Sequence, residues 1–422
     1  MSLKLRSRRD WGRLGMKSDW RTYTVQELID EGMLDEPLDG NHGSIHPKAS
    51  DYVSSGVPFI MANNLVNGKV DYANCAFITE TQASTLRKGF AKPGDVLLTH
   101  KATIGRTAIV DDEYETIILT PQVTYYRVKK GISNRYLKYY FDSSVFQKLF
   151  SNWAGAGSTR AYLGITAQRK LPIVLPPYDV QLKIAKCCGA LDDKIYHNQQ
   201  INDNLEQQAQ SYFQELFVDN ADPEWTTGSI SDLGVVVGGS TPSKAKPEYY
   251  TESGIAWITP KDLSINKSKF ISHGENDITE LGLKNSSATI MPEGTVLFSS
   301  RAPIGYIAIA AGEVTTNQGF KSVVPKPEIG TPFVYFFLKH NLPIIEGMAS
   351  GSTFKEVSGS TMKNIPAVIP DADTLGRFND FCAPIFAQQR ILEEECQSLA
   401  ALRDNLLPKL MSGEIDVSDI QL

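Results

Sequence analysis

Two segments of the chain carry mainly hydrophobic residues at alternating spacings of four and three, the pattern of a coiled-coil seam. The first seam consists of Ile184, Cys188, Leu191, Ile195, Asn198, Asn202, Leu205, Ala209, Tyr212 and Leu216. The second consists of Phe378, Cys382, Ile385, Gln389, Leu392, Cys396, Leu399, Arg403, Leu406 and Leu410. Each seam follows a proline-rich stretch, at 172–177 or 366–370, and predicts a long helix.

Polar and conformationally special residues interrupt both predicted helices. Four polar side chains occupy seam positions, namely Asn198, Asn202, Gln389 and Arg403. Because they cost stability if they are buried alone, we expect them to face one another or solvent and to help fix the register. Pro384 is expected to kink the second helix or restart it, since proline removes an intrahelical hydrogen bond. Gly413 is the expected end of that helix.

The order of the segments predicts how the two helices pair. Each helix follows a longer, non-helical segment, so the second helix must run back along the first to bury its seam. The pair is therefore expected to be antiparallel, and the molecule to have an approximate internal two-fold axis. A helix of about 37 residues spans roughly 55 Å at 1.5 Å per residue. Two domains at its ends would stand far apart.

The segments that precede the helices resemble each other. The matching stretches are 56–60 with 254–258, 93–98 with 293–298, 101–105 with 301–305, 157–159 with 351–353, and 171–172 with 365–366. The offset stays between 194 and 200 residues. A constant offset over this length indicates one module that is present twice.

Each copy of the module mixes both kinds of secondary structure. Short β-branched or aromatic runs, such as 117–120 and 306–309, alternate with Gly, Pro and Asn turns, and a helical stretch follows near 135–150 or 331–346. The predicted fold is α+β, with two similar domains separated by two long antiparallel coiled-coil helices. The predicted segments are a basic extension at 1–18, domain one at 19–175, helix one at 176–222, domain two at 223–370, and helix two with a tail at 371–422.

Composition favours a soluble globular protein and excludes indiscriminate nucleic-acid binding. Of the 422 residues, 41% are hydrophobic, and no apolar run approaches a membrane span or a secretory signal, so a cytoplasmic location is expected. The net charge is −6. Basic and acidic residues number 23 and 17 in 1–175, but 3 and 8 in 176–222 and 4 and 10 in 371–422. The acidic charge is thus concentrated in the helical segments.

Neither the cysteines nor the histidines form a metal-binding pattern. The five cysteines are Cys75, Cys187, Cys188, Cys382 and Cys396. None of them has the C-x2-C spacing of a zinc site, so reduced thiols are expected. His42 and His46 are four residues apart, but Gly43 and Pro47 place them in a loop rather than on one face of a helix. No metal site is predicted.

Several motifs are typical of one protein family. They are Gly-Gly-Ser-Thr-Pro-Ser at 238–243, Trp-Ile-Thr-Pro-Lys-Asp-Leu at 257–263, Leu-Phe-Ser-Ser-Arg-Ala-Pro-Ile-Gly at 297–305, Ala-Leu-Asp-Asp-Lys-Ile at 190–195, and Leu-Leu-Pro-Lys-Leu-Met-Ser-Gly-Glu-Ile at 406–415. Together they resemble the specificity subunit of type I restriction-modification enzymes, and the resemblance covers nearly the whole chain.

The resemblance implies that the two domains are target recognition domains, each of which reads one half of a bipartite DNA site. The helices would set the gap and dock two methyltransferase subunits, which bind S-adenosylmethionine and methylate adenine. Restriction subunits are a further possible partner. The family's specificity subunit has no catalytic residues, so we expect no catalytic, cofactor or metal site in this chain. An orphan DNA-binding regulator of the same build is an alternative, and a duplicated structural protein is another.

A third alternative is that the chain is itself an adenine-N6 DNA methyltransferase. Pro-Pro-Tyr at 176–178 resembles part of that family's catalytic motif, but the preceding Leu175 cannot accept a hydrogen bond from the adenine amino group. The glycines of 153–157 could be read as a cofactor turn. Only eighteen residues separate Gly157 from Leu175, too few for a doubly wound cofactor domain. The chain also lacks the G-x4-G-K-[ST] phosphate loop of an ATPase.

Comparison of the two copies predicts where DNA is contacted. Lys101 and Arg301 are both cationic in a tight strand-to-loop segment, where a cation can reach phosphate or, for arginine, a guanine edge. Positions that differ between the copies nearby are candidates for base contact. The predicted contacts are His100, Lys101, Thr103, Arg106, Ser300, Arg301 and Tyr306, then Thr159, Arg160, Thr353 and Lys355, and finally Arg169, Lys261 and Lys363, for which a plain surface charge is the competing interpretation.

The first eighteen residues have no counterpart before the second copy. Their charged residues are Lys4, Arg6, Arg8, Arg9, Asp10, Arg13 and Lys17. Two interpretations stay open, a flexible phosphate-binding arm and a non-native leader that precedes a native start at Met16.

Overall fold

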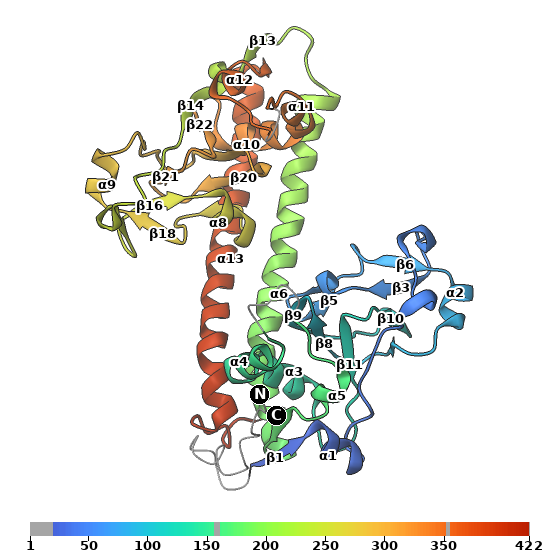
Figure 1. Cartoon of the computed structure of the whole chain (residues 1–422). Helices are drawn as coiled ribbons and strands as arrows, with labels where there is room; N and C mark the ends of the chain where they lie inside the picture. The colour runs from blue at the N-terminus through green and yellow to red at the C-terminus, as the bar shows by residue number, and fades with distance from the viewer. Residues whose placement is uncertain (1–19, 156–160, 352–354, 422) are drawn as a thin grey trace. The chain divides into compact units, whose positions relative to one another are not determined.

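The computed structural model describes residues 20–155, 161–351 and 355–421. The chain divides into two compact units: unit 1 comprises residues 1–194 and 398–422, and unit 2 comprises residues 195–397. Each unit combines strands with helices, including parts of the long helices α6 (Tyr178–Gln214) and α13 (Ala372–Ser412) (Figure 1). Among the described residues, none of the helices has the length and apolar character needed to cross a lipid bilayer.

Two four-stranded sheets and two smaller ribbons form the strand layers of unit 1. The sheet orders are β6-β3-β10-β7 and β2-β11-β8-β9, and the ribbons are β1-β12 and β4-β5. The strands are β1 (Arg21–Thr24), β2 (Leu38–Asp39), β3 (Val57–Ile60), β4 (Leu65–Val66), β5 (Lys69–Val70), β6 (Ala76–Ile78), β7 (Phe90–Ala91), β8 (Val96–Lys101), β9 (Thr103–Ile109), β10 (Ile117–Leu119), β11 (Val123–Tyr126) and β12 (Pro172–Leu175). The predicted strand at 117–120 is thus present as β10.

Helices of unit 1 close its main core against the long helices. They are α1 (Val25–Asp30), α2 (Glu80–Thr85), α3 (Asn134–Asp142), α4 (Ser144–Trp153) and α5 (Ile165–Gln168). The predicted helical stretch near 135–150 is two helices, because Ser143 ends α3 and caps α4. Aromatic side chains of α3 and α4 pack in one core with Ile184 of α6 and Leu410 of α13.

Unit 2 is built from a five-stranded sheet, a four-stranded sheet and one ribbon. The sheet orders are β14-β22-β19-β20-β17 and β15-β18-β16-β21, and the ribbon is β13-β23. The strands are β13 (Thr226–Ser229), β14 (Gly234–Gly238), β15 (Tyr250–Thr251), β16 (Ile255–Ile258), β17 (Phe270–Ile271), β18 (Asn276–Ile278), β19 (Val296–Ser300), β20 (Ile304–Ala310), β21 (Thr315–Thr316), β22 (Lys321–Pro325) and β23 (Pro366–Ile369). The predicted strand at 306–309 lies within β20.

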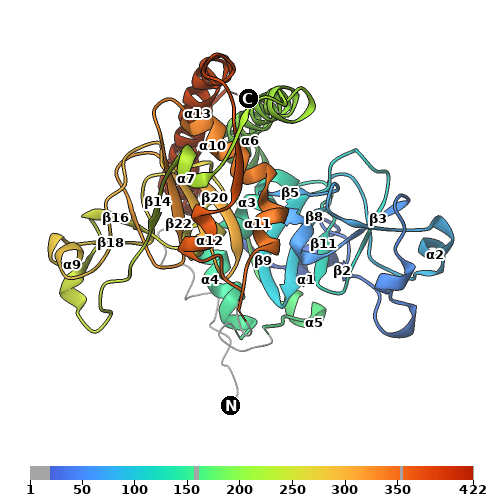
Figure 2. The ribbon, with the colours of Figure 1, turned by 90° about the horizontal axis from the view of Figure 1, so that it is seen from above.

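Short helices complete unit 2, and α10 carries most of its aromatic core. They are α7 (Ile230–Leu233), α8 (Pro260–Ile265), α9 (Glu280–Lys284), α10 (Thr331–His340), α11 (Leu342–Gly347) and α12 (Gly359–Lys363). Helix α10 packs on β19, β20 and β22 of the five-stranded sheet and lies between that sheet and the long helices (Figure 2). Phe333 and Phe336 of α10 meet Phe213 of α6 and Phe378 of α13 there.

Within each unit the two long helices run in opposite directions. In unit 2, Asn198 of α6 donates to Glu395 of α13, whereas Tyr212, further along α6, meets Phe378, earlier in α13. In unit 1, Arg403 of α13 contacts Asp192 of α6. Three of the polar seam residues, Asn198, Gln389 and Arg403, therefore have side-chain partners. Asn202 receives the Gln389 amide only at its backbone carbonyl, and its side-chain oxygen is buried without a hydrogen bond.

Of the two outcomes expected at Pro384, a kink or a restart of the second helix, the restart does not occur. Helix α13 is continuous from Ala372 to Ser412. The missing proline N–H would have bonded the carbonyl of Asp380, an exposed residue, where water can replace the lost donor. The predicted end at Gly413 is confirmed, because this residue has a left-handed φ of 75° directly after the last helical residue.

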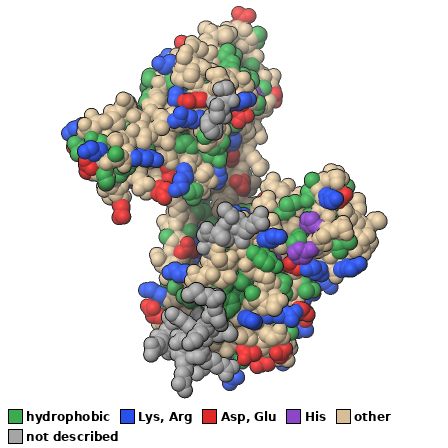
Figure 3. Space-filling model, in the orientation of Figure 1, with side chains coloured by type: hydrophobic (Ala, Val, Ile, Leu, Met, Phe, Trp, Pro, Cys, Tyr) green, Lys and Arg blue, Asp and Glu red, His purple; other side chains and the backbone are tan. Residues whose placement is uncertain are grey.

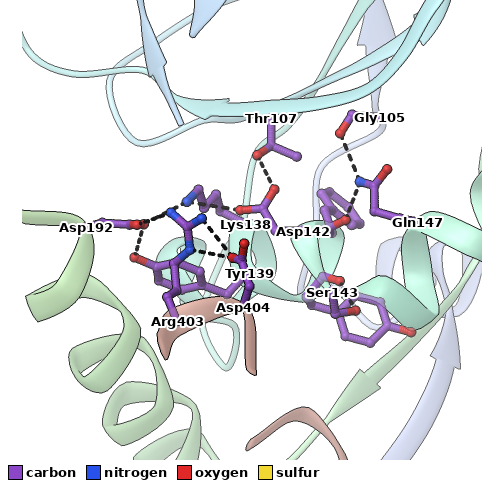
Figure 4. Close-up of polar contacts among 12 residues, drawn as sticks. Gly105, Thr107, Lys138, Tyr139, Asp142, Ser143, Gln147, Asp192, Arg403 and Asp404 are labelled. Carbon is purple, nitrogen blue, oxygen red and sulfur yellow. Dashed lines mark hydrogen bonds and ion pairs between the residues drawn. The ribbon is translucent and has the colours of Figure 1, made fainter. Parts of the chain in front are cut away.

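A largely buried carboxylate of α6, Asp192, links helix α3 of unit 1 to both long helices. Asp192 accepts hydrogen bonds from the Tyr139 hydroxyl at 2.7 Å, from Lys138 Nζ at 3.1 Å and from Arg403 Nη1 at 2.7 Å (Figure 4). Lys138 also pairs with Asp142 at 3.0 Å. Burial opposes ionisation of Asp192, but these cations and hydrogen bonds outweigh it and lower its pKa. Helix α3 is thereby fixed to both long helices.

Unit 2 uses the same kind of interaction with different residues. Glu206 of α6 pairs with the buried Lys269 and with Lys339 of α10, and accepts a hydrogen bond from the Tyr335 hydroxyl at 3.2 Å. Lys269 Nζ also lies 4.0 Å from the ring centre of Phe386 on α13. Burial alone would raise the pKa of Glu206, but the two lysines outweigh it and lower that pKa.

Replacement of Glu206 tests how much this network contributes to the free energy of unfolding. Glu206→Gln leaves the ammonium group of Lys269, whose side chain is 6% exposed, without its counter-charge, so we expect the free energy of unfolding to fall by about 3 kcal/mol. Denaturant unfolding measures the loss. Glu280→Gln, which removes an exposed pair with Lys284, is the control, with an expected change below about 0.5 kcal/mol.

The same variant has a defined pH dependence. Because the folded-state pKa of Glu206 lies below its ordinary value of 4.5, the stabilisation is fully present above that pH and is lost as the pH falls through the folded pKa. We therefore expect the difference between wild type and Glu206→Gln to shrink below pH 4.5. A difference that stays constant down to pH 3, where the native fold persists, would contradict the ion-pair account.

Candidate nucleic-acid interface

Two β-hairpins carry the predicted cations at their tips. In unit 1 the hairpin β8–β9 turns through Lys101, Ala102 and Thr103, and in unit 2 the hairpin β19–β20 turns through 301–303. The bases of both hairpins are buried, since Val96 and Val296 have no exposed surface. Each tip therefore projects from a fixed β layer.

Both hairpins contain the same irregularity just before the tip. The strand register shifts after Leu98 in unit 1 and after Phe298 in unit 2. At the shift, Thr99 Oγ1 accepts the backbone N–H of Arg106 at 2.9 Å, and Ser299 Oγ accepts that of Tyr306 at 2.7 Å. These buried hydroxyls replace the ladder hydrogen bonds that a bulge removes, so a small hydroxyl residue is suited to this position.

The tips hold alanines in a conformation that favours glycine. Ala102 has a φ of 63° and Ala302 a φ of 46°, in the left-handed region that costs an L residue of order 1 kcal/mol or more. Such strain persists only where neighbouring contacts impose it, and it is concentrated at binding sites. Here the backbone N–H of Ala102 donates to the carbonyl of Ala161 at 3.0 Å.

A second segment closes over each tip. In unit 1 the backbone of Tyr162 bridges to Lys101, and Leu163 donates to the carbonyl of His100 at 3.0 Å. In unit 2, Glu356 bridges to Arg301, and its neighbour Val357 donates to the carbonyl of Ser300 at 3.0 Å. The two sites share a backbone frame but differ in side chains.

Close packing fixes each hairpin behind its tip. Gly105 has a φ of 85°, and a Cβ there would lie 2.3 Å from Gln147 Oε1 on α4. The Gln147 amide donates to the carbonyl of Gly105 at 2.9 Å (Figure 4). In unit 2 a Cβ at Gly305 would lie 2.6 Å from Leu342 on α11. A substitution at either glycine would therefore be strained by its left-handed φ, and it would also force the side chain of Gln147 or Leu342 to move.

His100 and Ser300 were predicted to contact DNA, and the structure buries both. Each has 0% exposed surface. His100 Nδ1 lies 3.1 Å from the carbonyl of Leu163, and the Ser300 hydroxyl donates to the carbonyl of Gly319 at 3.1 Å. Because a side chain without exposed surface cannot reach a base, the prediction of DNA contact is wrong for these two residues. His100 and Ser300 instead stabilise the tips through hydrogen bonds in the interior of each unit.

His100 lies beside a polar cluster in the interior of unit 1. Its Nε2 is 3.9 Å from a carboxylate oxygen of Asp39, which also pairs with Lys88 and with His42 at 2.9 Å. Burial lowers the pKa of His100 to about 4, so the ring is neutral at pH 7. Among the described residues, no group of three or more His, Cys, Asp or Glu side chains is placed to bind a metal ion.

The structure distributes the other predicted residues over several elements. Exposed at or beyond the tip of unit 1 are Lys101, Thr103 and Arg106. In unit 2, Lys355 lines a shallow hollow with 302–304 and Glu346. Tyr306 is half-buried, with Lys267 Nζ 4.3 Å from its ring centre.

Three predicted residues are away from the tips or already paired. Arg169 follows α5 and pairs with Glu36, and Lys261 on α8 pairs with Glu275 at 2.5 Å. Lys363 is exposed at the end of α12. Thr159, Arg160 and Thr353 lie outside the described residues. The surface-charge interpretation thus fits Arg169 and Lys261 as well as DNA contact does.

Sequence reasoning missed Tyr162, Glu356 and Lys321. Glu356 Oε2 lies 3.4 Å from Arg301 Nη1, and its other oxygen lies 3.5 Å from Lys321 Nζ. Tyr162 is 49% exposed, and its ring centre lies 5.7 Å from that of His100. Extension of the match between 157–159 and 351–353 by three residues would have aligned Tyr162 with Glu356.

The charges on the face drawn in Figure 3 are mixed. On the face drawn in Figure 3, the described Lys and Arg side chains are scattered among Asp and Glu and do not form one continuous basic patch. A surface of this kind disfavours tight, indiscriminate attachment to phosphates. It leaves more of the binding free energy to contacts at particular positions.

Comparisons with known proteins relate the chain to one family. A sequence model for the type I restriction modification DNA specificity domain matches residues 18–207 and 223–393. The MjaIX specificity subunit of a type I restriction enzyme from Methanocaldococcus jannaschii is 39% identical over 191 residues, 43% of this chain and 44% of that protein. The HindI specificity subunit from Haemophilus influenzae is 23% identical over 94% of this chain and 100% of its own length.

The fold is shared with solved structures, one of which covers nearly the whole chain. The S subunit of a type I restriction-modification system from M. genitalium aligns over 97% of this chain and 98% of its own, with a TM-score of 0.56 and 15% identity. At this identity the likeness concerns the fold alone.

The burial of His100 predicts a pH-dependent stability. In the unfolded chain the ring titrates near its ordinary pKa of 6.5, whereas in the folded chain it titrates at about 4. The unfolded state therefore binds more protons in this window, and folding stability falls by up to about 3 kcal/mol as the pH drops from 6.5 to 4.

His100→Asn, which keeps a donor toward Leu163, is expected to reduce this pH slope in denaturant unfolding. His197→Asn, at an exposed position on α6, is the control. If the slope of His100→Asn equals that of the wild type, His100 does not titrate as proposed.

Proposed function

Because the chain belongs to the type I restriction modification DNA specificity family, we propose that it is the DNA-recognition subunit of a type I restriction-modification complex. Residues 19–175 and 223–370 act as target recognition domains, and each reads one half of a bipartite site. The segments 176–222 and 371–422 act as antiparallel coiled-coil spacers, related by an approximate two-fold axis, and set the gap between the half-sites.

The pair of strained, cation-bearing hairpin tips is the observation that carries this proposal. Each tip combines a left-handed alanine with a cation, Lys101 or Arg301, above a buried strand layer. A fixed hairpin can present such a cation to a base edge at little cost in conformational entropy. Two tips with a common frame and different side chains suit two half-sites of different sequence.

The long helices suit spacing and partner docking better than DNA contact. Their segments hold 3 basic and 8 acidic residues at 176–222 and 4 and 10 at 371–422. Carboxylates that faced the duplex would be repelled by its phosphates. We therefore assign these surfaces to two methyltransferase subunits, which would bind S-adenosylmethionine and methylate adenine, and restriction subunits complete the proposed complex.

The chain itself is proposed to be non-catalytic. The Pro-Pro-Tyr stretch that resembles a methyltransferase motif leads into α6, which begins at Tyr178. Leu175 is buried in β12, and the Gln181 side chain donates to the carbonyl of Pro176 at 2.9 Å. These contacts give the motif a structural role as the start of a spacer helix.

Mapping of methylated adenines tests the proposed function. The full chain, expressed with a methyltransferase subunit of the same system in a host without other adenine methylation, is expected to direct methylation to one split sequence. Co-purification of the two proteins distinguishes this from an orphan DNA-binding regulator, which would bind DNA alone. A contiguous methylated motif, or no methylation despite a stable complex, would contradict the division into two half-site readers.

Reversal of charge at Arg301 tests the assignment of one tip to one half-site. Arg301→Glu is expected to weaken binding to one half-site about 10- to 100-fold and to leave the other unchanged, because a good arginine–guanine pair is worth about 1–3 kcal/mol. Fluorescence anisotropy with duplexes in which one half-site at a time is scrambled measures both. Lys284→Glu, on exposed α9, is the control, and equal losses at both half-sites would show that the assignment is wrong.

A further inference from the structure

The residue that packs over each tip occupies the same backbone position in both units, but its side chain differs. It is the aromatic Tyr162 in unit 1 and the acidic Glu356 in unit 2. Tyr162 and Glu356 each bridge to the tip cation, and the following residue donates to the carbonyl that precedes that cation. The offset between them is 194 residues, as for the matched glycines 157 and 351. A frame that stays constant while its side chain changes from an aromatic ring to a carboxylate is typical of a position that selects among ligands.

Glu356 is an unusual group for a surface that meets DNA. Its carboxylate is half-exposed and has Arg301 Nη1 at 3.4 Å and Lys321 Nζ at 3.5 Å, and Lys355 precedes it in the chain. A carboxylate here reduces phosphate attraction for every DNA sequence. Its placement between the two cations Arg301 and Lys321 therefore indicates a benefit that depends on the DNA sequence.

The geometry of the pair provides that benefit. Glu356 approaches one Nη atom of Arg301, at 3.4 Å, which leaves other N–H groups of the guanidinium available. In the major groove a G·C pair presents two acceptors on guanine, N7 and O6, beside one donor, the N4 amino group of cytosine. An arginine next to a carboxylate presents the complementary row of donors and an acceptor.

Tyr162 cannot make this interaction, and the structure holds its ring in another way. A Cβ at Gly164 would lie 2.9 Å from the Tyr162 hydroxyl oxygen and 3.3 Å from its ring. The ring thus lies against Gly164, with His100 also in contact. Tyr162 is 49% exposed and presents an aromatic surface next to Lys101, to which its backbone bridges.

On the basis of the proposed function, we propose that Tyr162 and Glu356 are specificity-determining residues and that Arg301 and Glu356 together read a single G·C base pair. Arg301 donates to guanine, and Glu356 accepts from the cytosine amino group while it orients the guanidinium. Tyr162 gives the other half-site a different preference, through contact with an apolar base edge such as a thymine methyl group.

Selection from a random-sequence duplex library tests this inference, with the full-length chain in complex with the methyltransferase subunits of its system. The wild type is expected to select a split sequence with one invariant G·C position in the half-site of unit 2. Glu356→Gln is expected to lower the preference for G·C at that position about 10-fold or more, to leave the other half-site unchanged, and to tighten binding to non-target duplex because a negative charge is lost. Tyr162→Gln is the matched variant, and it should alter the other half-site only.

Arg301→Lys provides a second, independent variant that keeps the charge. Lysine lacks the planar fork of arginine, so this variant should lose preference at the same G·C position as Glu356→Gln, with little change in affinity for non-target duplex. Thermal unfolding of each variant verifies that the fold is intact.

Three outcomes would overturn the inference. Glu356→Gln could bind every duplex more tightly with an unchanged selected sequence, which would mean that the carboxylate only repels phosphate. The two unit 2 variants could affect different positions, or both half-sites could degrade together. A wild-type chain that selects no split sequence would instead contradict the proposed function itself.

Discussion

The fold depends on a largely buried carboxylate of α6 in each unit, Asp192 or Glu206, whose side chain is 21% exposed. A buried carboxylate is stable only when cations and hydrogen-bond donors surround it. Asp192 obtains them from α3 and α13, and Glu206 obtains them from α10 and the buried Lys269. The hydrophobic seam alone would allow the helices to slide against the sheet layer, because apolar contacts are not directional. The ion pairs form at only one position of each long helix along its domain, and they therefore fix where the helix packs.

Short series of hydrogen bonds and ion pairs also connect the long helices to the hairpins that carry the tips. In unit 1, Lys138 links Asp192 to Asp142, whose carboxylate accepts the hydroxyl of Thr107 in β9. In unit 2, Glu393 of α13 accepts two backbone N–H groups at the start of β17, and Lys269 in turn accepts the N–H of Ile309 in β20. The strand that leaves each tip is therefore connected to a long helix by few side chains.

Local patterns were enough to predict the two long helices, the strands at 117–120 and 306–309, and the helix end at Gly413. They failed where a long-range contact or an irregular strand decides the outcome. His100 and Ser300 follow the register shift of their hairpins, so strand alternation could not reveal which face they occupy. Glu356 reaches Arg301 across 55 residues, a pairing that no local spacing reveals.

The alanines in the left-handed turns have a consequence for how recognition can diversify. Alanine restricts the unfolded chain more than glycine does, and in both units the residues on either side of it differ while the turn is kept. Side chains that project from such a turn make few contacts with the interior, so their replacement barely perturbs folding. New base preferences can therefore arise by single substitutions at the hairpin tips, without compensating changes in the hydrophobic core.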